Sequence, residues 1–115
     1  MHALIIEDEP LIAVLIEDLL RSVGYTSVDF AVTEAEAVAM AEERRPDLIT
    51  SDVRLAEGCG IEAVEAICGD ASIPVVFITG TAWQVRERMR DAVVVPKPFG
   101  AKDLTLALAA VGLAE

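Results

Sequence analysis

Five residues of this chain have side chains that could together handle a phosphoryl group. They are two neighbouring acids near the N-terminus, one acid in the middle of the chain, and a hydroxyl and an ammonium further on: Glu7, Asp8, Asp52, Thr79 and Lys97. Clustered carboxylates without histidine or cysteine suit a hard cation such as Mg²⁺ better than zinc or copper. A carboxylate beside Mg²⁺ can accept a phosphoryl group, while a lysine neutralises charge on its oxygens and a hydroxyl donates a hydrogen bond to it.

These residues stand at or just after the ends of short apolar runs, as expected of buried strands. Five such runs are predicted strands, over residues 3–6, 27–32, 48–51, 74–78 and 92–95. Apolar residues at helical spacing occupy the segments between them. The first helix is predicted from Pro10 with Gly24 as its C-terminal cap, and Thr33 has the spacing of a capping box with Glu36. Later helices are predicted from Gly60, around Val85, and over residues 101–113.

This alternation predicts one α/β domain over residues 1–115. The connections are too short for anything but right-handed crossovers, so the sheet is expected to be parallel. The chain is far shorter than a barrel requires. The predicted fold is therefore a doubly wound, flavodoxin-like five-stranded sheet with strand order 2-1-3-4-5. The carboxyl ends of strands 1, 3, 4 and 5 then line one crevice, which brings the five residues together.

Composition narrows the classes of partner. The net charge of −11 would repel DNA, RNA and anionic lipid, so we expect proteins or cations as partners, with no nucleic acid and no membrane. The N-terminus lacks the pattern of a signal peptide, and no apolar run approaches the ~20 residues of a membrane span. A cytoplasmic protein is expected, with Cys59 and Cys68 as reduced loop and core thiols. His2 is expected to be solvated.

Taken together, the motifs resemble those of the receiver domains of two-component response regulators. The resemblance runs from Ala3 to about Leu113 and rests on four groups of residues: Glu7-Asp8, Asp52, Thr79-Gly80 and Lys97-Pro98-Phe99. It implies that Asp52 is the phosphoacceptor, and that a histidine kinase or phosphotransfer protein is the donor. It further implies no enzymatic activity beyond self-catalysed phosphoryl acceptance and autodephosphorylation.

The resemblance also implies a role for each site residue. Mg²⁺ would be held by the carboxylates of Asp8 and Asp52 and by the backbone carbonyl of Arg54, with Glu7 acting through water. Thr79 and Lys97 would bind the phosphoryl oxygens, and the Lys97–Pro98 bond would be cis. The Arg54 side chain, two residues after the acceptor, is predicted to lean over the site and tune the lifetime of the phosphoryl group.

Three positions depart from the family pattern. Val94 stands where relatives usually have an aromatic ring that turns inward on phosphorylation. The segment between Thr79 and Lys97 is a few residues short, which predicts a brief or irregular fourth helix. Ala56 replaces a common proline in the loop after Asp52. The phosphorylation chemistry is unaffected by these changes, whereas the usual relay from threonine to aromatic ring is not expected to operate.

Two surfaces are predicted to contact partners. Arg86, Arg88 and Arg90 concentrate positive charge in the fourth helical segment, and the last helix is apolar on two sides. Its two stripes are Leu104, Ala107, Leu108 and Val111, and then Leu106, Ala110 and Leu113. A helix that is apolar most of the way round is either deeply buried or covered by a partner. We therefore expect a downstream protein or a second copy of the chain to dock there, with signalling through protein contacts and no output domain.

Other interpretations of the same residues remain open. Asp8 could cap the helix that begins at Pro10, and Asp52, Thr79 and Lys97 could be ordinary surface or strand-end residues. A pseudo-receiver that binds partners without phosphorylation is favoured by Val94 and the short fourth helix. A small phosphatase with Asp52 as nucleophile would need a second acid two residues later, where Arg54 stands.

Overall fold

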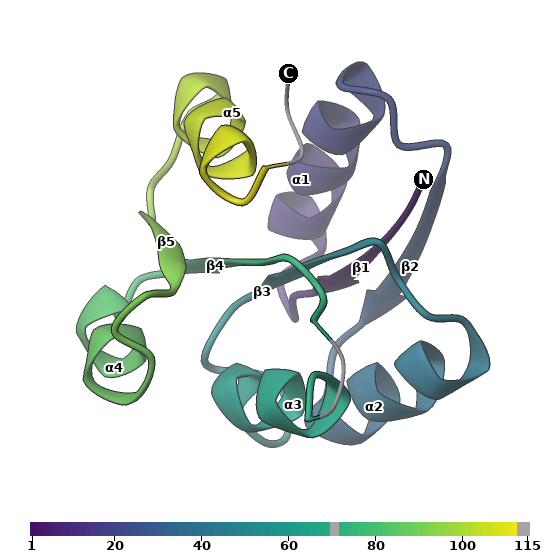
Figure 1. Ribbon diagram of the computed structural model, residues 1–115, viewed down its shortest axis with the longest axis vertical. Coiled ribbons are helices and arrows are strands. Elements are labelled where there is room, and N and C mark those ends of the chain that lie inside the picture. Colours follow the sequence, from purple (N-terminus) through teal and green to yellow (C-terminus); the bar gives the residue numbers. More distant parts are fainter. Residues whose placement is uncertain (70–71, 113–115) are drawn as a thin grey trace.

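The computed structural model describes residues 1–69 and 72–112, which form five strands alternating with five helices (Figure 1). In chain order the elements are β1 (His2–Ile6), α1 (Pro10–Ser22), β2 (Ser27–Ala31), α2 (Glu34–Glu43), β3 (Leu48–Ser51), α3 (Gly60–Ile67), β4 (Val75–Thr79), α4 (Ala82–Arg88), β5 (Val93–Pro96) and α5 (Ala101–Ala110). Within the described residues, no helix is long and apolar enough to cross a membrane.

The predicted fold is confirmed. All neighbouring strands pair in parallel, and their order in the sheet is β2-β1-β3-β4-β5. Helices α1 and α5 cover one face of the sheet, and α2, α3 and α4 cover the other (Figure 1). Alternate side chains of each strand point to opposite faces. In β1, for example, Ala3 and Ile5 therefore belong to the core under α1 and α5, while Leu4 and Ile6 belong to the core under the other three helices.

Local sequence explains where the helices begin and end. Pro10 occupies the first turn of α1, where its missing N–H costs no helical hydrogen bond. Gly24 follows that helix with φ +112°, a conformation that favours glycine. At α2, Thr33 accepts a hydrogen bond from the Glu36 N–H at 3.1 Å, and Glu36 Oε1 accepts one from the Val32 N–H at 2.9 Å. The predicted capping interaction is thus present, with its return bond shifted to the preceding residue.

The structure sharpens several predicted boundaries. Strand β4 runs one residue further than predicted, so Thr79 is its last residue. Helix α4 has only seven residues, which confirms that this helix is brief. Helix α5 ends at Ala110, three residues before the predicted end, and Leu113 lies outside the described residues. Cys59 and Cys68 are free thiols at the two ends of α3, and both are partly buried against the same core cluster, so the expected contrast between a loop thiol and a core thiol is not seen.

The prediction that His2 is solvated is wrong, because its side chain is only 4% exposed. Strand β1 begins at His2 itself, and its backbone exchanges hydrogen bonds with Asp47. Its ring lies against the neighbouring strand β2, with Nδ1 2.9 Å from Ser27 Oγ and Nε2 3.1 Å from Asp29 Oδ2. The sheet therefore starts one residue earlier than the apolar run suggests, and it buries the imidazole ring of His2 at its amino-terminal end.

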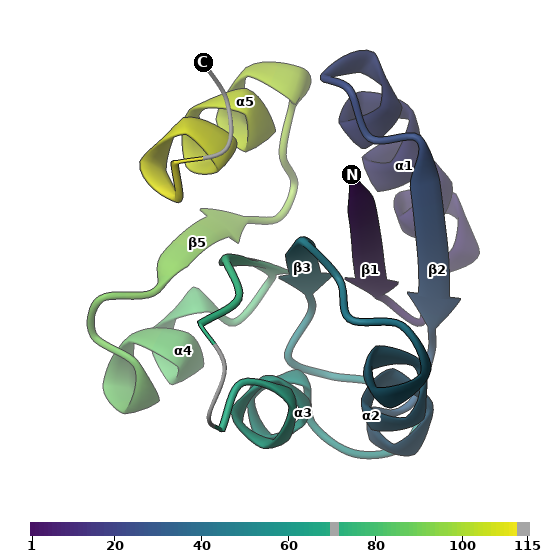
Figure 2. The same ribbon diagram turned by 45° about the vertical axis from the view of Figure 1, so that its right-hand side comes forward.

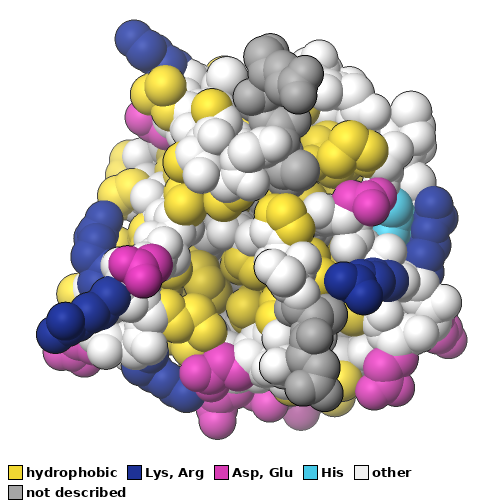
Figure 3. Space-filling model, viewed as in Figure 1, with side chains coloured by type: hydrophobic (Ala, Val, Ile, Leu, Met, Phe, Trp, Pro, Cys, Tyr) yellow, Lys and Arg dark blue, Asp and Glu magenta, His cyan; other side chains and the backbone are white. Residues whose placement is uncertain are grey.

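The short α4 leaves an apolar hollow at the amino-terminal end of the sheet (Figure 3). The hollow lies between α3 and α4, and its lining includes Val64, Phe77 and Met89. One ion pair bridges the two helices, from Arg88 Nη2 to Glu65 Oε1 at 2.6 Å. Both of its side chains are nearly half exposed, and such exposed pairs contribute only ~0.2–1 kcal/mol. This ion pair therefore adds little to the attachment of α4, whose Val85 is fully buried in the core cluster that also contains Val64 of α3.

Candidate functional site

The sheet itself positions the first two acids of the site. The backbone N–H of Glu7 donates to Ala31 at 2.9 Å, which extends the pairing of β1 with β2 by one residue. The N–H of Asp52 donates to Ile6 at 2.9 Å and extends the pairing of β3 with β1 in the same way. Ladder hydrogen bonds therefore fix the backbone of both residues at the carboxyl edge of the sheet, where parallel α/β proteins bind ligands.

Lys97 reaches the same edge from β5. Its N–H donates to the Thr79 carbonyl at 3.0 Å, and the following Lys97–Pro98 bond is cis, as predicted. Its ammonium lies 2.8 Å from Asp52 Oδ2 and 3.0 Å from Glu7 Oε1. A third carboxylate, that of the exposed Glu9, lies 3.7 Å away. The interpretation of Lys97 as a solvated surface residue is wrong, because its side chain is only 16% exposed.

Burial and charge act together on these groups. Burial raises the pKa of Glu7 above its usual value, and the hydrogen bond and charge of Lys97 offset this only in part. Burial by itself would lower the pKa of Lys97, but its hydrogen bonds to Asp52 and Glu7 outweigh that effect and raise the pKa. Lys97 is therefore held as a cation beside the Asp52 carboxylate.

The acid cluster fits a divalent metal ion. One carboxylate oxygen from each of Glu7, Asp8 and Asp52 lies within 4.8 Å of the other two. The Asp52 carboxylate is oriented at both ends, since Oδ1 accepts from the Val53 N–H at 2.6 Å and Oδ2 accepts from Lys97. Three clustered carboxylates without nitrogen or sulfur donors match the ligand preference of Mg²⁺. The donor set is therefore suited to the predicted ion.

Asp8 and Arg54 have groups left free for such an ion. Helix α1 has Glu9 as its N-cap residue, without a side-chain capping bond, and Asp8 accepts no hydrogen bond from the described residues. The interpretation of Asp8 as a helix cap is therefore wrong. The carbonyl of Arg54 likewise accepts no hydrogen bond within the described part of the chain. The Arg54 side chain is exposed.

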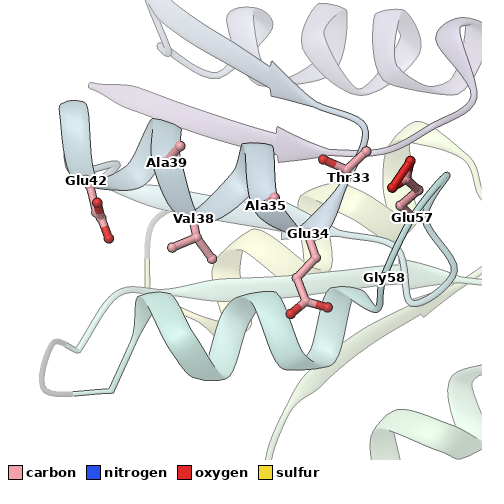
Figure 4. A pocket seen from close by; sticks show the side chains of 8 residues that line it. All are labelled: Thr33, Glu34, Ala35, Val38, Ala39, Glu42, Glu57 and Gly58. Carbon is pink, nitrogen blue, oxygen red and sulfur yellow. The ribbon is translucent and has the colours of Figure 1, made fainter.

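The loop after Asp52 is held by close packing. A Cβ on Gly60 would lie 1.7 Å from the Asp52 carbonyl oxygen, so only glycine fits there. The loop is also pinned to α2, because Glu34 Oε1 accepts from the Cys59 N–H at 3.0 Å and the Glu34 N–H donates to the Glu57 carbonyl at 3.0 Å. A shallow groove of about 580 Å³ runs along α2 beside this loop, with Glu34 pointing toward α3 (Figure 4). It is separate from the crevice and is lined mainly by small and acidic residues.

Thr79 lies at the site, but the hydrogen-bonding contacts of its hydroxyl are with Thr81 and not with Asp52. Its Oγ1 accepts from the Thr81 N–H at 3.1 Å and lies 3.2 Å from Thr81 Oγ1. Thr81 is the N-cap residue of α4 and was not recognised from the sequence. The signal that could have identified it is the spacing of Thr81 and Gln84, which is that of a capping box.

The predicted partner surfaces are only partly as expected. In Figures 1 and 2, β5 lies at the sheet edge between α4 and α5. Arg86 and Arg90 are exposed, whereas Arg88 is committed to its ion pair with Glu65, so the three arginines do not form one free patch. In α5, one predicted stripe packs on the core, whereas Leu106 and Ala110, the described residues of the other stripe, are exposed, Leu106 by 61%. Helix α5 is therefore neither deeply buried nor fully exposed.

Comparisons with known proteins agree with this geometry. The family model for the response regulator receiver domain matches residues 3–109. The chain is 42% identical over 100 residues to the phyllosphere-induced regulator PhyR of Methylorubrum extorquens, a match that covers 84% of this chain and 38% of that protein. The chain thus spans well under two thirds of the length of this relative.

Solved structures show the same fold. The receiver domain of Erythrobacter litoralis PhyR superposes with a TM-score of 0.85 at 35% identity, covering 99% of this chain and 92% of that one. The receiver domain of the sensor histidine kinase PA1611 from Pseudomonas aeruginosa has a magnesium ion coordinated in its active-site cleft. It superposes with a TM-score of 0.79 at 28% identity, covering 96% of this chain and 97% of that one. The chain belongs to the response regulator receiver domain family.

Proposed function

We propose that this protein is a phosphoacceptor of a two-component phosphorelay, and that Asp52 is the residue phosphorylated. The observation on which the proposal depends is the position of Lys97, whose ammonium bridges Asp52 at 2.8 Å and Glu7 at 3.0 Å in a cluster that also contains Asp8. A buried acceptor carboxylate beside a fixed cation and further acids is equipped for phosphoryl transfer. The protein would not otherwise be an enzyme, and we place it in the cytoplasm with its kinase.

In the transfer step, an oxygen of Asp52 attacks the phosphorus of a phosphohistidine. The new bond is between Asp52 and phosphorus, and the bond between phosphorus and the imidazole nitrogen breaks, so that its electron pair leaves with the imidazole. Lys97 is already within hydrogen-bond distance of the acceptor and can turn to a phosphoryl oxygen. Thr79 supplies a hydroxyl from the adjacent strand. Hydrolysis reverses the state, since water attacks the phosphorus and the carboxylate of Asp52 leaves.

The transfer requires Mg²⁺ in this proposal. The carboxylates of Asp8 and Asp52 and the carbonyl of Arg54 would hold it, with Glu7 acting through water. When bound, the ion neutralises charge that develops on the phosphoryl oxygens. Before it binds, Lys97 is the cation closest to Asp52 and Glu7 among the contacts of the described residues.

The surface beside the crevice suits a protein as phosphodonor. Leu11 in the first turn of α1 is 87% exposed, and Leu15 one turn later is 45% exposed. A small cavity of about 340 Å³ next to them is lined by Ile12, Leu15, Lys97, Pro98 and Phe99. Exposed leucines that adjoin a binding site favour a protein partner over a small solute. A histidine kinase or phosphotransfer protein would cover this apolar surface as it reaches Asp52.

A second protein would bind the phosphorylated form and pass on the signal. Phosphorylation adds nearly two negative charges in the crevice. Downstream contacts are proposed at Arg86, Arg90 and the exposed side of α5 with Leu106, with Arg88 available once its ion pair opens. A second copy of the chain is the alternative occupant of this surface.

Mass spectrometry of the intact protein tests the assignment. The protein is incubated with Mg²⁺ and a small acyl phosphate, and one added phosphoryl group is expected on the wild type. The adduct should be absent from Asp52→Asn and from samples treated with a chelator, and it should be retained in the matched control Asp18→Asn on the exposed side of α1. If neither the acyl phosphate nor a phosphorylated kinase produces an adduct, the protein is a phosphorylation-independent binding module. Turnover of a phosphomonoester would instead indicate a hydrolase.

A further inference from the structure

The hydroxyl of Thr79 is engaged by α4 in this structure. Thr79 is buried, and its Oγ1 accepts from the Thr81 N–H at 3.1 Å and contacts Thr81 Oγ1 at 3.2 Å. Short hydroxyl-to-backbone turns of this kind compete with helix capping for the same groups. Thr79 therefore has to exchange these partners before its side chain can turn to a phosphoryl oxygen.

The start of α4 is incomplete in a matching way. Thr81 and Gln84 are three residues apart, at the N-cap and N3 positions, which is the arrangement of a capping box. Yet Thr81 makes no side-chain capping bond, and Gln84 Oε1 is buried without a hydrogen-bond partner among the described residues. A buried acceptor left unpaired in this way is unusual and requires an explanation.

The start of α2 offers a comparison within the same chain. Thr33 and Glu36 have the same spacing there, and the threonine does cap its helix at 3.1 Å, while the glutamate accepts the N–H of Val32, the residue before the N-cap, at 2.9 Å. At α4 the N–H that would satisfy Gln84 is the N–H of Thr81, which Thr79 accepts instead. The two sets of hydrogen bonds exclude one another.

We propose that Thr81 is a positioning residue for Thr79, and that its hydrogen-bond partner changes from Thr79 to Gln84 when Asp52 is phosphorylated. The inference rests on the proposed function. In the structure described here, Thr81 holds the hydroxyl of Thr79 toward α4. Once a phosphoryl oxygen recruits that hydroxyl, the N–H of Thr81 is released to Gln84 Oε1, and the Gln84 N–H, which now donates to the Thr81 carbonyl at 2.9 Å, turns to Thr81 Oγ1 to complete a capping box. The first turn of α4 then rearranges, and this reports the phosphorylation without a ring at Val94.

Helix α4 is suited to respond to so small a change. It has seven residues and is tied to α3 by the exposed Arg88–Glu65 pair. Its first turn carries Trp83, which is 60% exposed and is the only tryptophan of the chain. Intrinsic fluorescence therefore reports directly on the segment between Thr81 and Gln84.

The experiment measures two quantities on one sample. Intact mass gives the fraction of protein phosphorylated by Mg²⁺ and an acyl phosphate, and Trp83 emission and its quenching by acrylamide give the state of α4. For the wild type we expect the fluorescence to change in proportion to the adduct. Absence of an adduct with both the acyl phosphate and a phosphorylated kinase would refute the proposed function, whereas a full adduct with unchanged Trp83 fluorescence would overturn the inference alone.

Variants separate the two sets of hydrogen bonds. Gln84→Ala removes only the side-chain acceptor of the capping box, so the phosphoryl adduct should still form. The equilibrium constant for the rearrangement of α4 should fall by roughly threefold to tenfold, which is the effect of one hydrogen bond. Thr81→Val should also reduce the Trp83 change, and Thr81→Ser should restore it. Two controls should behave as the wild type: Glu87→Ala, exposed on the same helix, and Thr105→Val, whose hydroxyl bonds only within α5.

These variants can also contradict the inference. If Thr81→Val and Gln84→Ala both fold, as judged by circular dichroism, and both give the full Trp83 change at full phosphorylation, Thr81 does not position Thr79. Failure of Thr81→Ser to restore a response lost in Thr81→Val would equally overturn it, since the serine keeps the hydroxyl on which the exchange depends.

Discussion

Replacing Gly60 by alanine should damage both the stability of the protein and its acceptor site. Gly60 is the first residue of α3, and its backbone passes directly against the Asp52 peptide. A Cβ there would lie 1.7 Å from the Asp52 carbonyl oxygen and 2.5 Å from Ser51 Oγ. To restore an ordinary contact of about 3.5 Å, the two backbones would have to separate by about 1.8 Å.

That displacement sets the size of the effect. It strains the Gly60 N–H bond to the Val53 carbonyl and the Ser51 hydroxyl bond to the Asp52 carbonyl, both 2.8 Å long. Overpacking costs about 1–3 kcal/mol and each lost hydrogen bond about 1 kcal/mol, while alanine regains up to about 1 kcal/mol of helix propensity. We expect a loss of about 2–4 kcal/mol in the free energy of unfolding. This is a large part of the roughly 6–17 kcal/mol typical of a domain of this length.

Urea denaturation followed by circular dichroism measures the loss. With a slope of about 2 kcal/mol per molar urea, the middle of the typical range, the midpoint should fall by about 1–2 M. Gly80→Ala is the matched control, because a Cβ there meets nothing within 4 Å and its midpoint should be unchanged or slightly raised. In the folded Gly60→Ala protein, phosphorylation of Asp52 by acyl phosphate should slow by up to about 100-fold, since the acceptor is displaced. Equal midpoints for the two alanine variants, with wild-type phosphorylation, would refute the close approach of Gly60 to Asp52.

Two further predictions concern His2, at the amino-terminal end of the sheet, and Arg54, in the loop after Asp52. His2→Ala should lower the free energy of unfolding by about 2–4 kcal/mol, because it empties a buried site and leaves Ser27 and Asp29 without their ring partner; a urea midpoint equal to that of the wild type would show that the buried ring contributes nothing. Arg54→Ala should leave the urea midpoint unchanged, since the side chain is exposed, but should change the rate at which phosphorylated Asp52 loses its phosphoryl group. An unaltered dephosphorylation rate in an intact-mass time course would show that Arg54 does not tune the site.

The fold and the acid cluster were predictable because each depends on a short local pattern. The apolar run before Asp52 identifies a buried strand, and a parallel sheet then brings the end of that strand to the ends of its neighbours. Glu7 and Lys97 follow from the same rule. Lys97 lies about 3 Å from both Glu7 and Asp52. This closeness follows from the same rule, because the ladder hydrogen bonds that extend each strand hold the three strand ends side by side.

The features that the sequence did not reveal depend on contacts between distant segments. His2 is buried because β1 pairs with β2 and meets Asp47, and nothing in the residues around His2 indicates that pairing. From the sequence, the hydroxyl of Thr79 could face either the acid cluster or the start of α4. Only the three-dimensional structure shows that it contacts Thr81. Likewise, the pairing of Arg88 with Glu65 joins residues 23 positions apart and divides a cluster of arginines that looks continuous in the sequence.

The site is rigid on one side and adaptable on the other, and under the proposed function this asymmetry would determine where a phosphorylation signal travels. Glu7 and Asp52 are buried and continue the sheet, so a new doubly charged group cannot displace them without breaking strand pairing. On the other side, Thr79 is joined through Thr81 to a seven-residue helix with an unpaired buried acceptor and one exposed ion pair. Rearranging Thr81 and the first turn of α4 would therefore cost less free energy than displacing Glu7 or Asp52. A valine at position 94 is thus compatible with switching, because α4 can respond without an aromatic ring that changes position.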